Sequence, residues 1–132
     1  MPHFHVEYSG NLEGKIDMGG LCECIRATAA GIDAFPMPGI RVRATRVDHY
    51  AIADGGLAHG FVDISIRLRA GRSEDAKQDA TQRVFDAVKA YLAPALSQHS
   101  IALSLEMRDI DPKLSPKTGT IRDHLAATTQ ET

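Results

Sequence analysis

The hydrophobic residues of this chain follow two different periods in turn, and this alternation most restricts the folds open to it. In four segments they recur at every second position, as in a strand with one buried face. In two others they recur every three or four positions, as in an amphipathic helix. The predicted order is strand, helix, strand, turn, strand, helix, strand. The apolar strand faces comprise Phe4, Val6 and Tyr8; Ile40, Val42 and Ala44; Val62, Ile64, Ile66 and Leu68; and Ile101, Leu103, Leu105 and Met107. The apolar helix faces comprise Met18, Leu21, Cys22, Ile25, Ala29 and Ile32, then Ala76, Ala80, Val84, Ala87, Val88, Tyr91 and Leu92.

Proline, glycine and capping residues mark the boundaries of these segments. The proline-rich run 35–39 ends the first helix, because proline cannot continue one. The segment Asp54-Gly55-Gly56 predicts a turn. Ser73 suits the N-cap of the second helix, and Pro94 predicts a kink or an end for it. The alternation slips after Thr45, which predicts a bulge or bend in the second strand.

These elements predict an α+β fold of two fused β-α-β units, about residues 2–53 and 57–110, in one domain of residues 1–110. The two strands that flank each helix are expected to run parallel with a right-handed crossover. A four-stranded sheet then carries both helices on one face. The chain is too short to cover the other face, so we expect self-association. Residues 111–132 are polar and aperiodic, which predicts a C-terminal arm or a partly disordered tail.

Composition excludes several classes of protein. The formal net charge of −2 gives no attraction to nucleic acid or to an anionic membrane surface. No apolar run approaches the ~20 residues of a membrane span, and the amino terminus lacks the pattern of a secretory signal. The two cysteines, Cys22 and Cys24, are too close together to form a disulfide framework. We therefore expect a cytoplasmic protein.

Pro2 follows the initiator methionine, and removal of Met1 would leave its secondary amine at the start of a strand. An exposed α-amine titrates near ~7.7–8.0, and burial and nearby cations both lower that pKa. A neutral amine whose conjugate acid titrates near the working pH is what general-base catalysis requires. Pro2 is therefore the predicted catalytic base. Because many proteins begin with Met-Pro, the prediction depends on the residues beside it.

Three arginines are candidates for binding an anion. Arg41 and Arg43 share the polar face of the second predicted strand, and Arg72 stands just before the second helix. Arginine offers a planar fork to a carboxylate, and helix amino termini attract anions. An organic acid held at two or three points is the functional interpretation. A solvated strand face and an ordinary helix-start residue are the alternative, which is the better one for any single arginine.

Other constellations do not favour a site. His3, His5, Cys22 and Cys24 are of metal-binding types, but helical residues two apart point to different sides. The sequence has no glycine-rich phosphate loop and no Ser-His-Asp signature. We expect no metal.

Several short segments stand in an order and spacing typical of one enzyme family. They are residues 2–7, 35–43, 53–55 and 70–73, and then Leu103-Ser104 followed by Asp111-Pro112. Each segment alone is common, but the combination is specific. Over roughly residues 2–114 the chain resembles the 5-carboxymethyl-2-hydroxymuconate delta-isomerases of the tautomerase superfamily.

The resemblance implies a tautomerase-like fold, a homotrimer with sites near subunit contacts, and no metal or cofactor. It implies a polycarboxylate dienol substrate, 5-carboxymethyl-2-hydroxymuconate, isomerised to 5-oxopent-3-ene-1,2,5-tricarboxylate in homoprotocatechuate catabolism. The family's base falls on Pro2 and its substrate-binding arginines on Arg41 and Arg72. Arg43 is a further candidate for substrate binding, and Phe61 a candidate wall of the pocket.

Three other functions stay open at this point. One is a tautomerase of broader specificity that acts on 2-hydroxymuconate or phenylpyruvate-type enols. The second is a hydrolytic dehalogenase of the same superfamily, which would need a carboxylate to activate water, and the sequence assigns none. The third is a non-catalytic trimeric binding protein of the same fold. Turnover that depends on Pro2 separates the enzymes from the binding protein.

Overall fold

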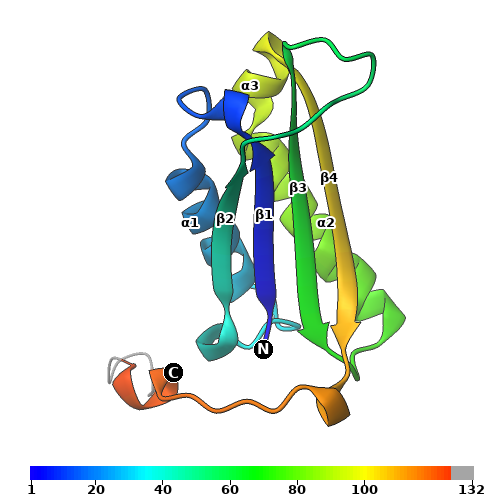
Figure 1. Ribbon diagram of the computed structural model, residues 1–132. Helices are drawn as coiled ribbons and strands as arrows, with labels where there is room; N and C mark the ends of the chain where they lie inside the picture. The colour runs from blue at the N-terminus through cyan, green and yellow to red at the C-terminus, as the bar shows by residue number, and fades with distance from the viewer. Residues whose placement is uncertain (126–132) are drawn as a thin grey trace.

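The computed structural model describes residues 1–125, and residues 126–132, where part of the predicted disordered tail falls, lie outside the described residues. Four strands form one mixed sheet, and the helices α1 and α2 pack on the same face of it (Figure 1). The predicted α+β fold is therefore confirmed. The elements are β1 His3–Ser9, α1 Met18–Ala30, β2 Arg41–Val47, β3 His59–Arg69, α2 Glu74–Tyr91, α3 Ala93–Gln98 and β4 Ser100–Ile110.

The strand order is β2-β1-β3-β4, so the two halves meet at the centre of the sheet. β1 and β2 are parallel, as are β3 and β4, whereas β1 and β3 run antiparallel. This topology places the first residues of β1 beside both the start of β2 and the end of β3. His3 pairs with Arg41 on one side and with Arg67 on the other.

The predicted bulge in β2 is wrong. The register of β1 with β2 runs without a break from His3 opposite Arg41 to Ser9 opposite Val47. A complete parallel partner satisfies the backbone of β2 along its length, so the local slip in apolar parity does not distort the strand.

Alternate residues of the strands form a dry core with the apolar stripes of the helices. Phe4 of β1 is fully buried and meets Phe35 edge to face, with ring centroids 5.1 Å apart. Such an aromatic pair contributes roughly 0.5–1.5 kcal/mol beyond the burial of its area. Because both rings lie next to Pro2 or the loop before β2, this end of the core gives the amino terminus a rigid support.

The helix boundaries follow from their caps. Asp17 accepts a hydrogen bond from the Gly20 backbone N–H and begins α1. The Ser73 hydroxyl accepts one from the Ala76 backbone N–H and begins α2, as predicted. α2 ends at Tyr91, and Pro94 lies in the first turn of the separate helix α3.

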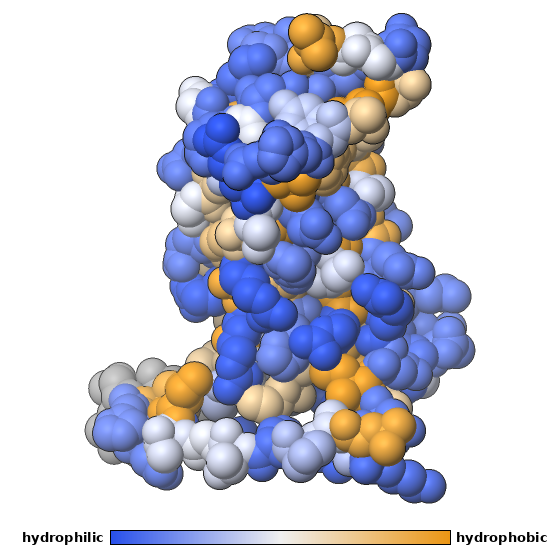
Figure 2. Space-filling view, in the orientation of Figure 1, coloured by the Kyte–Doolittle hydropathy of each residue, from blue (hydrophilic) through white to orange (hydrophobic). Residues whose placement is uncertain are grey.

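The other face of the sheet is hydrophilic. Figure 2 views this face and shows polar side chains over its centre. They come from the strand positions that alternate with the core: His5 of β1 binds Thr45 of β2, and Ser104 of β4 binds Asp63 of β3. No helix of the described chain covers these rows (Figure 1).

After β4 the chain forms an arm, which we define as residues 111–125. Two single-turn 3₁₀ helices, Pro112–Leu114 and Ile121–His124, are joined by an extended segment. The arm turns back below the end of the sheet where the amino terminus lies (Figure 1). No helix within residues 1–125 is long and apolar enough to cross a membrane.

Candidate active site

Pro2 is buried at the entrance of β1, where it is still bonded to Met1. The Arg41 backbone N–H donates a 3.1 Å hydrogen bond to the Pro2 carbonyl, which extends the β1–β2 ladder to the proline. Gly39 lies directly against the Pro2 ring. These contacts fix the direction of the Pro2 nitrogen.

Two hollows flank Met1, and both reach the arm. The first has a volume of about 310 Å³ and the second of about 360 Å³. Met1 and Lys117 line both of them. The remaining residues of the first are His3, Arg67, Arg69, Ile110, Pro112, Ser115 and Pro116. Those of the second are Pro38, Gly39, Arg41, Thr118, Gly119, Ile121 and Arg122. Since Met1 is one of the two residues that both hollows share, its removal would open part of the wall between them.

The charges around these hollows have one sign. Neither hollow is lined by a described aspartate or glutamate. Burial, followed by the positive charges of Lys117, Arg72, Arg69 and Arg41, holds the pKa of the Met1 amino group below its usual value. An amine at this position is therefore biased toward its neutral form, and an anion would find several cations within reach.

Arg41 is the first residue of β2 and lines the second hollow. Its Nη1 donates to the Gly39 carbonyl at 3.0 Å and lies 3.5 Å from the Met1 sulfur. No described carboxylate forms an ion pair with Arg41. The carbonyl contact orients the guanidinium, and the loss of Met1 would free part of it for a ligand.

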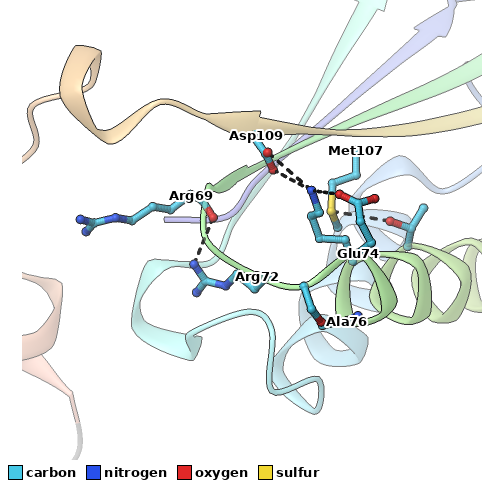
Figure 3. Close-up of polar contacts among 9 residues, drawn as sticks. Arg69, Arg72, Glu74, Ala76, Met107 and Asp109 are labelled. Atoms are coloured by element: carbon cyan, nitrogen blue, oxygen red, sulfur yellow. Dashed lines mark hydrogen bonds and ion pairs between the residues drawn. The ribbon is translucent and has the colours of Figure 1, made fainter.

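Arg72 is anchored by two backbone carbonyls. Its Nε donates to Ala34 at 3.2 Å and its Nη1 to Arg69 at 3.1 Å, the second of which Figure 3 shows. Gly71, with φ of 121°, makes the turn that brings Arg72 back toward the end of β3. Arg72 acts on the amino terminus through its charge and does not itself line either hollow.

The start of α2 is also fixed to the sheet. Lys77 lies 2.8 Å from Glu74 and 3.4 Å from Asp109 at the end of β4 (Figure 3). The side chain of Arg69 extends away from α2 in the same view. Lys77 thus engages Glu74 at the start of α2 and Asp109 at the end of β4. No ion pair joins Arg69 or Arg72 to a carboxylate of the described chain.

Arg43 and His3 lie beside the site on the open sheet face. Arg43 is exposed, and its Nη1 lies 3.4 Å from His3 Nδ1. Burial and then Arg67, Arg43 and Arg41 hold the pKa of His3 below its usual value. His3 lines the first hollow, whereas Arg43 lines neither hollow.

The chain does not bring Phe61 to Pro2. The Phe61 backbone N–H donates to the Ser9 hydroxyl, at the far end of β1. At about 3.3 Å per residue the two ends of β1 lie roughly 20 Å apart. Phe61 instead packs edge to face with Tyr50, their ring centroids 6.3 Å apart. The antiparallel β1–β3 pairing is the cause, so a role for Phe61 at this pocket would need a second copy of the chain.

Sequence reasoning missed four cationic residues that line these hollows: Arg67, Arg69, Lys117 and Arg122. Arg69 is the last residue of β3, and only the antiparallel pairing with β1 brings it to the amino terminus. Lys117 lies in the aperiodic arm, where no hydrophobic period could place it. The alternation of hydrophobic residues in β3 placed Arg69 on the polar face of the strand. The order of the strands was needed to place it near the amino terminus.

The described residues contain no group of three histidines, cysteines or acids suited to a metal ion. Burial raises the pKa of the Cys22 thiol, which favours its uncharged form. The arrangement instead suits proton transfer: a ring nitrogen in a recess can act as a base while cations hold a carboxylate-bearing substrate.

Comparison with known proteins identifies the family. A sequence profile of 5-carboxymethyl-2-hydroxymuconate isomerase matches residues 2–125. The 5-carboxymethyl-2-hydroxymuconate Delta-isomerase of Escherichia coli is 34% identical over 121 residues, 92% of this chain and 96% of that protein. A crystal structure of a 5-carboxymethyl-2-hydroxymuconate delta-isomerase has a TM-score of 0.86 at 33% identity, covering 94% of this chain and 92% of its own. The crystal structure of a 5-carboxymethyl-2-hydroxymuconate isomerase from Deinococcus radiodurans R1 has a TM-score of 0.85 at 30% sequence identity, and the match covers 93% of this chain and 92% of that one.

More distant structures share the fold alone. A member of the cis-3-chloroacrylic acid dehalogenase family has a TM-score of 0.61 at 17% identity over 98% of this chain and 96% of that one. A fused 4-OT structure has a TM-score of 0.58 at 18% sequence identity, and the match covers 83% of this chain and 85% of that one. These structural similarities confirm the tautomerase-like architecture. The family profile then identifies which family of that fold the chain belongs to. The chain therefore belongs to the 5-carboxymethyl-2-hydroxymuconate isomerase family and is an isomerase.

Proposed function

We propose that this isomerase converts 5-carboxymethyl-2-hydroxymuconate to 5-oxopent-3-ene-1,2,5-tricarboxylate, with the amine of Pro2 as its proton carrier after removal of Met1. The observation that carries the proposal is the position of Pro2, which is buried and bonded directly to Met1, the residue that lines both hollows. The charged residues that line both hollows are cationic. Family membership supports the substrate, and a role in homoprotocatechuate catabolism follows from that substrate.

The reaction needs one proton to leave oxygen and one to reach carbon. The neutral Pro2 nitrogen takes the proton of the 2-hydroxyl group and becomes an ammonium. The electron pair of the broken O–H bond moves into the conjugated chain, and a carbon further along takes the proton back from the nitrogen. Atoms and electrons balance without a cofactor. General acid–base catalysis of this kind supplies about 10²–10⁴-fold.

The arginines hold the substrate and its developing charge. Arg41 faces the second hollow with its guanidinium oriented by the Gly39 carbonyl. Arg72 is oriented by two carbonyls, with its Nη2 atom not hydrogen bonded to any described residue. A guanidinium that is already oriented in the free enzyme can stabilise a dienolate and a carboxylate without a further loss of conformational entropy. Arg43, exposed on the open face, would assist only a substrate that extends over the edge of the sheet.

We also propose that the chain forms a homotrimer. No helix of the described chain covers the open face of the sheet, which leaves that face accessible to neighbouring copies (Figure 1). Fused 4-OT structures of the same fold are described as symmetric and asymmetric trimers. A neighbouring copy is also what could bring Phe61 to a Pro2 pocket. Sedimentation equilibrium is expected to give three times the 14.3 kDa mass of one chain, and a monomeric mass would contradict the proposal.

The activity is tested by following the dienol spectrophotometrically. Intact mass should show that Met1 is absent from the active protein. Pro2→Ala should lower kcat by about 10²-fold or more. Arg41→Ala and Arg72→Ala should mainly raise KM, whereas Arg83→Ala, which removes an exposed arginine of α2, should change neither. Full turnover by a chain that retains Met1 would exclude Pro2 as the base.

A further inference from the structure

The arm is a built element, although its sequence has no period. Asp111 begins it: its carboxylate accepts from the Lys113 N–H at 2.9 Å, and its carbonyl accepts from the Ser115 hydroxyl at 2.7 Å. Pro112 and Pro116 restrict the backbone on either side and line the first hollow. The next residue along the chain is therefore held at the amino-terminal hollows.

That residue is Lys117, which lines both hollows that flank Met1. It forms no hydrogen bond or ion pair with any residue in the described part of the chain. Lys77 differs, because it is engaged by both Glu74 and Asp109. An unpaired ammonium beside Arg69 on one side and Arg41 on the other is repelled by both, and an anion would relieve that repulsion.

Its charge acts on the amino terminus as well. Among the charged groups around the Met1 amine, Lys117 contributes most to lowering the pKa of that amine, ahead of Arg72, Arg69 and Arg41. The amine and the lysine therefore share one small space. A substrate that approached the Pro2 nitrogen would pass within reach of the ammonium.

We infer that Lys117 binds a carboxylate of the substrate and that the arm thereby selects dienols carrying an additional carboxylate. This rests on the proposed function. Arg67 and Arg69 line only the first hollow and Arg41 only the second, whereas Lys117 lines both and can reach a carboxylate in either. Lysine suits this position as a compact point charge on a flexible stem that adapts to either hollow.

The test compares two substrates in the full-length enzyme, at a pH where activity no longer depends on pH. One is 5-carboxymethyl-2-hydroxymuconate, and the other is 2-hydroxymuconate, which lacks the carboxymethyl group. Lys117→Gln should raise KM for the first by about 10- to 100-fold, the worth of one charged hydrogen bond, with little change in kcat. KM for the second should change much less. Lys117→Arg should restore the preference, and Lys113→Gln, on the same arm but away from the hollows, should not alter it.

A second measurement does not require turnover. Inhibition constants of propane-1,2,3-tricarboxylate and propane-1,3-dicarboxylate give a ratio that reports the extra carboxylate site. The ratio should fall in Lys117→Gln and be retained in Lys117→Arg. An unchanged ratio together with unchanged KM values would overturn the inference while leaving Pro2 chemistry intact. Loss of Pro2-dependent turnover in the wild type would instead overturn the proposed function, and the ratio would still test Lys117.

Discussion

Gly39 lies so close to Pro2 that a Cβ atom at Gly39 would stand 3.2 Å from the Pro2 Cδ atom. That separation is tighter than an ordinary van der Waals contact. The Pro2 ring cannot rotate away, because its carbonyl is tied to the Arg41 N–H. The absence of a side chain at position 39 therefore sets where the proline nitrogen lies.

Gly39→Ala is expected to displace Pro2 by a few tenths of an ångström and to lower kcat about tenfold with a small effect on stability, because proton transfer depends steeply on geometry. Steady-state kinetics and urea unfolding check this. Gly31→Ala is the matched control, since a Cβ there would meet its nearest atom, the Thr28 carbonyl oxygen, at 3.6 Å. Equal kcat values for the two variants would show that Gly39 does not position the proline.

The pH dependence of activity should follow the cations at the amino terminus. Arg69 is one of the cations that lower the pKa of the Met1 amine, and after removal of Met1 we expect the same cations to act on the Pro2 amine. A positive charge disfavours the ammonium form, so the Pro2 amine would lose its proton at lower pH and kcat/KM would rise with pH to a plateau. Arg69→Gln removes one such charge, raises the pKa of the amine and moves the acidic limb to higher pH. Arg83→Gln makes the same charge change on the surface of α2 and should leave the limb in place. Activity that instead fell as the amine deprotonated would mean that the ammonium is the active form.

Gly20 of α1 lies directly against the Tyr91 hydroxyl at the end of α2. The Tyr91 hydroxyl donates to the Asp17 carbonyl at 2.9 Å, and a Cβ at Gly20 would collide with that hydroxyl. Gly20→Ala is expected to lower the free energy of unfolding by about 1–3 kcal/mol through overpacking. Gly19→Ala, one residue earlier, should be neutral or stabilising by up to about 1 kcal/mol, because alanine favours helix and has room there. Urea unfolding of both variants checks the difference, and a stabilised Gly20→Ala would be inconsistent with this packing.

The cap of α2 connects stability to the site. Ser73→Ala removes the acceptor for the Ala76 N–H and should cost about 1 kcal/mol of unfolding free energy. Because Arg72 immediately precedes the cap, KM should rise as well. Ser73→Thr keeps the hydroxyl and should retain both properties. An unaltered unfolding midpoint in Ser73→Ala would show that the cap contributes nothing.

Hydrophobic periodicity was enough to predict the elements and the fold class. The alternation of Phe4, Val6 and Tyr8 and the helical stripe from Met18 to Ile32 depend on local geometry, which neighbouring residues determine. Capping by Ser73 is local in the same way. The bulge predicted from the change in alternation after Thr45 was wrong, because the continuous pairing of β2 with β1 keeps the strand regular.

The sequence by itself determined that strands and helices alternate, that one sheet face is polar and that Pro2 opens a strand near cationic residues. Tertiary structure alone decided which cations reach the amino terminus. The antiparallel pairing of β1 with β3 brings Arg69 to the hollow beside Met1 and places Phe61 at the opposite end of β1, and the return of the arm adds Lys117. Strand order and chain reversal are set by contacts between residues far apart in the chain, which no local period encodes.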